Sequence, residues 1–240
     1  PPPPPAPPPP RAPPAAPGPP RPPGPRAARL DLRCAAGRAT VEEHRSTRPR
    51  EARMDVLAAH GDAIGAFDAL VRPLPDDRWP LPTPDADWTV RDLVNHVTAE
   101  QLWTPELLAG RWIEDVGGVF DGDVLGDDPV DRWVDASVQA REAFLAPDAL
   151  DRRVHLSYGD ESGAEYCAQM TFDLVVHAWD LARATGGDEE VEPALVAWAL
   201  RYAAARSTVL ARGALGRGPR AVAGGAGGLT RLLALTGRAR

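Results

Sequence analysis

The sequence predicts an all-α protein, most simply a four-helix bundle with additional helices at its C-terminal end. Three observations lead to this prediction. Apolar residues recur with the 3.6-residue period of a helix in several long segments. A proline or glycine follows these segments, where a helix is expected to end. The alternation of apolar and polar residues that is typical of a strand is clear only in residues 154–158.

Residues 1–53 differ from the rest of the chain in composition. They hold 18 of the 28 prolines, and ten arginines against four acidic residues. Such a stretch favours an extended, disordered tail because it has too little apolar surface to fold. Two alternatives are a proline-rich ligand for a small recognition domain and a misassigned start codon, since Met54 opens the first helical segment.

The helical pattern begins at Met54 and returns in six segments. The first segment ends at Pro73, and the second starts with Thr89 as N-cap and Asp92 placed for a capping box. Gly110 ends the second segment. The predicted helices cover 54–72, 89–108, 130–145, 165–184, 193–211 and 229–235.

The segments between these helices differ in character. Residues 114–128 are rich in glycine and aspartate and predict a long loop, whereas 151–164 predict a short extended segment. We expect residues 54–188 to form the helical bundle and 189–240 to form a C-terminal helical extension packed on it.

Composition limits the partners of the chain. Residues 54–240 carry 17 arginines against 30 acidic residues, and this balance argues against binding to nucleic acid. No apolar run approaches the roughly 18 residues of a membrane span, so we expect no membrane partner. The two cysteines, Cys34 and Cys167, have no metal-binding spacing and fit a reducing cytoplasm.

Polar residues interrupt two of the apolar helices. Asp173 and His177 are four residues apart and therefore lie on one helix face, and His96 lies at the edge of an apolar stripe on another helix. A buried carboxylate needs a partner. One carboxylate and two imidazoles suit a divalent ion with open coordination positions. The alternative is a hydrogen-bonded Asp–His couple without metal.

We expect structural roles for most of the remaining histidines, cysteines and tryptophans. We expect His60 at the surface and Cys167 to be a buried thiol, while His155 has a weaker claim to lie near the metal site. The tryptophans with core or pocket-wall positions are Trp88, Trp103 and Trp179.

Three segments resemble a known family. Residues 88–97 (WTVRDLVNHV) are similar to a helix signature of the DinB-like proteins, and the closer match is their branch of mycothiol-dependent maleylpyruvate isomerase-like metal-binding proteins from actinobacteria. Residues 176–186 (VHAWDLARATG) resemble the second signature, and 229–238 (LTRLLALTGR) resemble the C-terminal end of the family. The resemblance covers residues 54–240 and implies a DinB-type four-helix bundle.

The resemblance also implies a metal site and its chemistry. The family's metal ligands carry over onto His96, Asp173 and His177, with zinc, nickel or iron as the ion and mycothiol as a small thiol cofactor. The implied reaction joins that thiol to an electrophilic small molecule, as in a thiol S-transferase or isomerase. The chain departs from the family pattern at Asp173, where relatives often have Glu, and at Asp85, where they often have Cys.

Three further residues are candidates for contact with the cofactor or with the metal ligands. They are Asn95, Asp180 and Arg183, although Asp180 and Arg183 equally fit a surface ion pair. We expect a monomer or homodimer. A non-catalytic metal- or ligand-binding module and a scaffolding bundle with an empty site remain alternative functions, because a fold does not determine a reaction.

Overall fold

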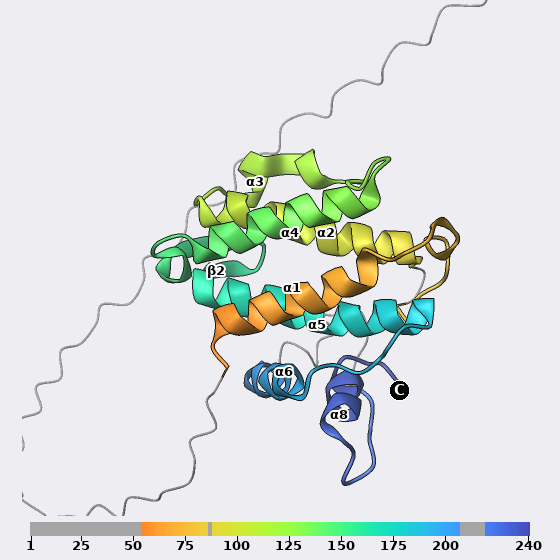
Figure 1. Cartoon of the computed structure of the whole chain (residues 1–240). Helices are drawn as coiled ribbons and strands as arrows, with labels where there is room; N and C mark the ends of the chain where they lie inside the picture. Colours follow the sequence, from red (N-terminus) through yellow and green to blue (C-terminus); the bar gives the residue numbers. More distant parts are fainter. Residues whose placement is uncertain (1–53, 86–87, 207–218) are drawn as a thin grey trace, which may run out of the picture. The chain divides into compact units, whose positions relative to one another are not determined.

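The computed structural model describes residues 54–85, 88–206 and 219–240, and this part of the chain is mainly helical (Figure 1). Its α-helices are α1 (Val56–Val71), α2 (Val90–Leu108), α3 (Ile113–Val116), α4 (Pro129–Leu145), α5 (Gly163–Thr185), α6 (Pro193–Ala205) and α8 (Gly228–Leu235). The all-α prediction is confirmed. The predicted tail, 1–53, and the end of the predicted helix 193–211 lie outside the described residues.

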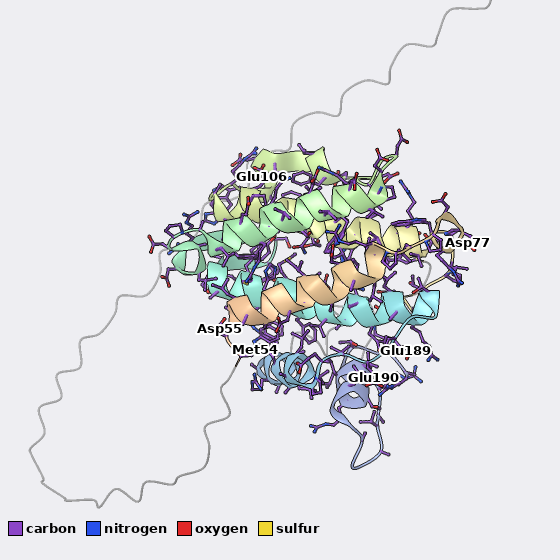
Figure 2. The ribbon with its side chains drawn as sticks, viewed as in Figure 1. Met54, Asp55, Asp77, Glu106, Glu189 and Glu190 are labelled. Carbon is purple, nitrogen blue, oxygen red and sulfur yellow. The ribbon has the colours of Figure 1, made fainter. Side chains whose placement is uncertain are left out.

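Capping side chains just before α1 and α2, and a glycine just after α5, determine where these helices begin or end. Asp55 caps α1 by accepting a hydrogen bond of 2.7 Å from the Ala58 N–H, and it lies at the start of that helix in Figure 2. Thr89 and Asp92 form the predicted capping box of α2. Gly186 ends α5 with a φ of 71°, a left-handed conformation that favours glycine.

Helices α1, α2, α4 and α5 pack around the main core. Helix α1 contacts α5 and α4, and α2 contacts α4 and α5. The rings of Phe67 on α1 and Trp133 on α4 lie 4.7 Å apart, and the Trp133 Nε1–H donates to Asp68. Fully buried residues of this core include Phe67, Leu93, Trp133, Leu174 and Leu181. This packing holds α2 and α5 side by side, and these two helices carry the predicted metal ligands.

The C-terminal helices α6 and α8 contact each other and lie beyond α1 and α5, on the side away from α4 (Figure 1). Trp179 of α5 forms a buried cluster with Val196 of α6 and with Leu229 and Leu233 of α8. The chain after α8 is thereby brought back toward α5.

Two of the predicted connections contain more structure than expected. The predicted loop 114–128 includes most of α3 and the 3-10 helix η2 (Gly117–Phe120), so the loop prediction was wrong for its first part. The extended segment is a hairpin in which β1 (Arg153–Leu156) pairs antiparallel with β2 (Gly159–Ser162). Shorter 3-10 helices are η1 (Asp76–Arg78) and η3 (Ala149–Asp151).

The prediction that His60 lies at the surface was wrong. Its side chain is fully buried, its ring lies 4.9 Å from the Phe144 ring, and Arg141 Nη1 lies 3.3 Å from its Nδ1. Cys167 is the predicted buried thiol, and burial raises its pKa to about 12. Among the described residues, no helix is long and apolar enough to span a membrane.

Candidate metal centre

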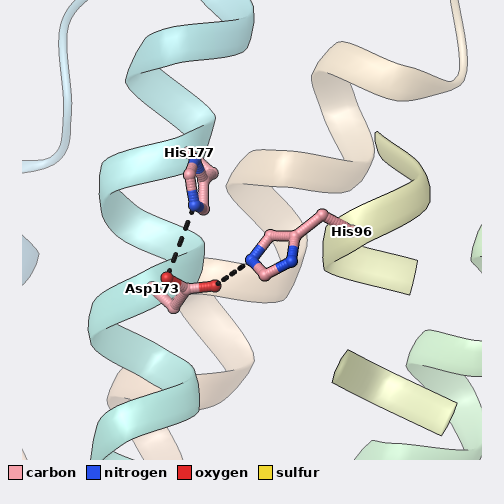
Figure 3. A group of neighbouring side chains, drawn as sticks. All are labelled: His96, Asp173 and His177. Atoms are coloured by element: carbon pink, nitrogen blue, oxygen red, sulfur yellow. Dashed lines mark ion pairs between the residues drawn. The ribbon is translucent and has the colours of Figure 1, made fainter. Parts of the chain in front are cut away.

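The structure brings together the three residues predicted as metal ligands. His96 comes from α2, and Asp173 and His177 come from adjacent turns of α5 (Figure 3). The two carboxylate oxygens of Asp173 face different imidazoles, with His96 Nε2 at 3.4 Å from Oδ2 and His177 Nε2 at 3.4 Å from Oδ1. One ligand atom of each residue lies within 4.8 Å of the others. Three donor atoms therefore converge on one point.

The cluster is closed on one side and open on the other. The exposed fraction of the side chain is 3% for His177, 17% for Asp173 and 31% for His96. Trp88 covers part of the site, because its ring lies 4.9 Å from the His96 ring and 5.9 Å from the His177 ring. This is the pocket-wall position predicted for Trp88. His96 is the most exposed of the three side chains, so the open side of the site is the one that His96 forms.

Asp180 holds His177 from behind. The Asp180 carboxylate is completely buried and accepts a 3.0 Å hydrogen bond from His177 Nδ1–H. Because a carboxylate cannot donate, the proton belongs on Nδ1, and this leaves Nε2 directed at Asp173. A histidine ligand of a metal commonly donates its second N–H to a carboxylate in this way.

Arg238, close to the C-terminal end, neutralises the buried Asp180. Its Nε lies 3.1 Å from Asp180 Oδ1 and its Nη2 lies 2.7 Å from Asp180 Oδ2. The same Nη2 donates a 3.0 Å hydrogen bond to Asp85. Asp85, His177 and Asp180 also lie close enough to hold a cation. The guanidinium of Arg238 supplies that positive charge, so we assign no second metal site there.

Opposite charges raise or lower the pKa values across the cluster. Burial acts to lower the pKa of His177, but the charge of Asp173 and hydrogen bonds to Asp173 and Asp180 outweigh it and raise the pKa to about 10. The pKa of His96 is also raised, because its hydrogen bond to Asp173 and the charge of Asp173 outweigh the opposing effect of burial. The two histidines hold the pKa of Asp173 well below its usual range, against the effect of burial. The cluster therefore favours positive charge next to Asp173.

These residues fit a divalent ion. Both imidazoles direct Nε2 toward the same carboxylate, and protons on these two nitrogens occupy the position that a cation would take. Two imidazoles and one carboxylate are donors that suit zinc, nickel or iron. Asp173, one methylene shorter than Glu, reaches both imidazoles from its place on α5.

The predicted cofactor-contacting residues have different surroundings. Asn95 binds the backbone of a loop, donating to Gly122 O at 2.8 Å and accepting from the Val124 N–H at 2.8 Å. Arg183 is half exposed and pairs with Glu189 at 2.8 Å. The predicted alternative of a surface ion pair is therefore confirmed for Arg183, with Glu189 as its partner, and was wrong for Asp180, which is buried beside Arg238.

His155 has its own partners. It lies 2.8 Å from Asp160 and stacks on Trp112, with ring centroids 3.8 Å apart. It is not one of the three clustered residues.

The sequence did not predict Arg238 or Glu100 as site residues. A signal for Glu100 existed, because it lies four residues after His96, whereas Arg238 meets Asp180 across 58 residues of sequence.

The comparison with protein families places the chain in a known family. A family model described as the mycothiol maleylpyruvate isomerase N-terminal domain matches residues 60–182, which include the whole cluster of His96, Asp173 and His177. The chain belongs to this family. The match confirms the family resemblance of the sequence, and it ends before α6, α8 and Arg238.

Relatives with known sequences are found in Mycobacterium tuberculosis. Two proteins, both called uncharacterized, come from strain CDC 1551 / Oshkosh and strain ATCC 25618 / H37Rv. Each is 35% identical to the chain over 158 residues, which cover 65% of this chain and 80% of the relative. No solved structure matches the chain significantly.

Proposed function

We propose that the chain binds a divalent metal ion through His96, Asp173 and His177 and uses it in the reaction of a small thiol with an electrophile. Zinc is the first candidate for the ion, and nickel and iron are the others. The observation that carries the proposal is that one donor atom of each of these three residues lies within 4.8 Å of the others, beside a His96 side chain that is 31% exposed. Three protein ligands with open positions are typical of catalytic rather than structural metal sites.

The family supports the choice of thiol. The matching domain is described as the mycothiol maleylpyruvate isomerase N-terminal domain, and we propose mycothiol or a related low-molecular-weight thiol for this chain. We also propose a DinB-type bundle for α1, α2, α4 and α5, a cytoplasmic location where such thiols stay reduced, and a monomeric or homodimeric state.

The chain's own residues prepare the site. Asp180 accepts the His177 Nδ1–H and thereby keeps Nε2 directed at the donor cluster. Arg238 balances the charge of Asp180, which has no contact with solvent. Trp88 lies against both imidazoles and excludes water from that side of the site. When bound, the ion would supply Lewis acidity that lowers the pKa of a thiol in its open position.

A thiol-consumption assay tests the proposal. Protein reconstituted with zinc, nickel or iron is mixed with mycothiol and a panel of electrophiles that includes maleylpyruvate, and loss of free thiol or isomerisation is followed. We expect turnover by the wild type and none by His177→Ala. Full metal loading without turnover on any electrophile would instead favour the non-catalytic metal- or ligand-binding module.

A further inference from the structure

Two contacts determine the register of α2 against α5. Near the start of α2, His96 meets Asp173, and near its end the Thr104 hydroxyl lies 3.4 Å from the Tyr166 hydroxyl. From the first contact to the second, the residue number increases on α2, from 96 to 104, and decreases on α5, from 173 to 166. The two helices therefore run antiparallel. The α2 residues between His96 and Thr104 on the same face must therefore lie opposite the turns of α5 between Asp173 and Tyr166.

Glu100 is the residue of α2 midway between these contacts. Residues four apart on a helix differ by only about 40° in direction. Because His96 and Thr104 both reach α5, Glu100 between them also faces α5. Side chains on a helix lean toward its N-terminus. The Glu100 side chain therefore leans toward His96 and toward the open side of the metal site.

The charges around Glu100 agree with this placement. Its carboxylate interacts electrostatically with His96, Asp173 and His177, and also with Tyr166 on the adjoining part of α5. Among the described residues, no hydrogen bond or ion pair is formed by the Glu100 carboxylate, although it is only partly exposed. Burial raises its pKa, and the charge of Asp173 adds to that effect, whereas the charges of His96 and His177 oppose it. A partly buried carboxylate that accepts no hydrogen bond favours a ligand that donates a proton or hydrogen bond.

We propose that Glu100 is a specificity-determining residue that selects protonated ligands, in particular a thiol, for the open side of the metal site. This inference rests on the proposed metal function and names the class of ligand. Glu100 accepts the S–H hydrogen bond and then the proton. The S–H bond breaks, an O–H bond forms on the carboxylate, and the electron pair stays on sulfur for attack on the electrophile. An anion that carries no proton meets the negative charge of Glu100 and is disfavoured.

Ligand binding to the cobalt-loaded protein tests this selection. The probes are 2-mercaptoethanol, which carries a proton on sulfur, and thiocyanate, which does not, and both are followed through the visible absorption of cobalt. We expect Glu100→Gln to bind the thiol at least about tenfold more weakly than the wild type and to bind thiocyanate equally or more tightly. The readout is the ratio of the two dissociation constants and needs no substrate turnover.

Glu106→Gln is the matched control, because it makes the same substitution on the same helix at a partly exposed residue that pairs with Arg111. It should leave both dissociation constants unchanged. Equal thiol and thiocyanate affinities in Glu100→Gln and wild type, or a shift of both ligands in the same direction, would overturn the selection by Glu100. Failure of the wild type to bind cobalt would reject the proposed metal site itself, which is a separate outcome.

Discussion

The protein buries two histidines in surroundings of opposite charge. His60 on α1 lies beside Arg141 and Phe144, and its Nε2 has no hydrogen-bond partner in the described part of the chain. His177 on α5 lies between the carboxylates of Asp173 and Asp180. Burial and the charge of Arg141 lower the pKa of His60 to about 3, whereas the carboxylates raise that of His177 to about 10.

This difference shows why burial of a histidine does not by itself indicate a metal ligand. His60 has a cation as neighbour, so a second cation there would be repelled. His177 has anionic neighbours and directs one nitrogen toward a cluster of donors. The sign of the neighbouring charge distinguishes the structural histidine from the candidate ligand.

The largest expected effect is the loss of metal binding when a candidate histidine ligand is replaced. His96→Ala or His177→Ala removes one of three protein ligands, and we expect the affinity for zinc to fall at least about 100-fold. His60→Gln should keep the wild-type affinity, because His60 faces Arg141 and not the cluster. Chelator competition measures all three variants. Wild-type affinity in both alanine variants would show that the ligands lie elsewhere.

The second prediction concerns the charge balance behind His177. Arg238→Met leaves the completely buried Asp180 without its guanidinium, and we expect a loss of about 3–5 kcal/mol in the free energy of unfolding. Arg183→Met, which removes an exposed pair with Glu189, should cost less than about 1 kcal/mol. Urea unfolding of the metal-free proteins measures both. Equal, small losses would contradict the role given to Arg238.

The third prediction separates the orientation of His177 from its presence. Asp180→Asn keeps the shape of the side chain but no longer requires the proton on His177 Nδ1. We expect zinc affinity to fall about 10–100-fold, less than in His177→Ala. Isothermal titration of zinc into both variants compares them, and an unchanged affinity in Asp180→Asn would show that the Asp180–His177 hydrogen bond does not support the site.

The smallest effects are the opposite pH dependences of the two histidines in metal-free protein. The raised pKa of His177 stabilises the fold fully below its unfolded value of 6.5, and this contribution is lost as pH rises toward about 10. The lowered pKa of His60 has the reverse sign, because the unfolded chain takes up a proton below pH 6.5 and stability falls toward about pH 3.

Urea unfolding across this pH range checks both signs. Each effect is on the order of a few kcal/mol at most. His60→Gln should flatten the acid side of the stability curve and leave the alkaline side, and His177→Gln should do the opposite. If both variants flatten the same side of the curve of unfolding free energy against pH, the two histidines do not have neighbours of opposite charge.

The sequence predicts the helices well and the site in part. The helical period, the Thr89–Asp92 capping box and Gly186 give the correct boundaries because these signals are local. The spacing of Asp173 and His177 is likewise local to one helix. The surroundings of His60 depend on Arg141, which lies 81 residues away, and no local pattern indicates that contact.

The remaining parts of the site are similarly long-range. Asp180 meets Arg238 only because α6 and α8 bring the C-terminal end back to α5. The position of Glu100 beside the site depends on the antiparallel register of α2 and α5, and this register is determined by packing between the helices. Sequence patterns thus identify the candidate ligands, whereas the charges around them come from segments far apart in the chain.

Anomalous diffraction from crystals of the zinc-loaded protein tests the central claim most directly. We predict one strong zinc peak within about 2.0–2.2 Å of His96 Nε2, His177 Nε2 and an Asp173 carboxylate oxygen. The same crystals should show no ion at His60. A zinc peak at other residues, or no peak between these three side chains in fully loaded crystals, would contradict the account.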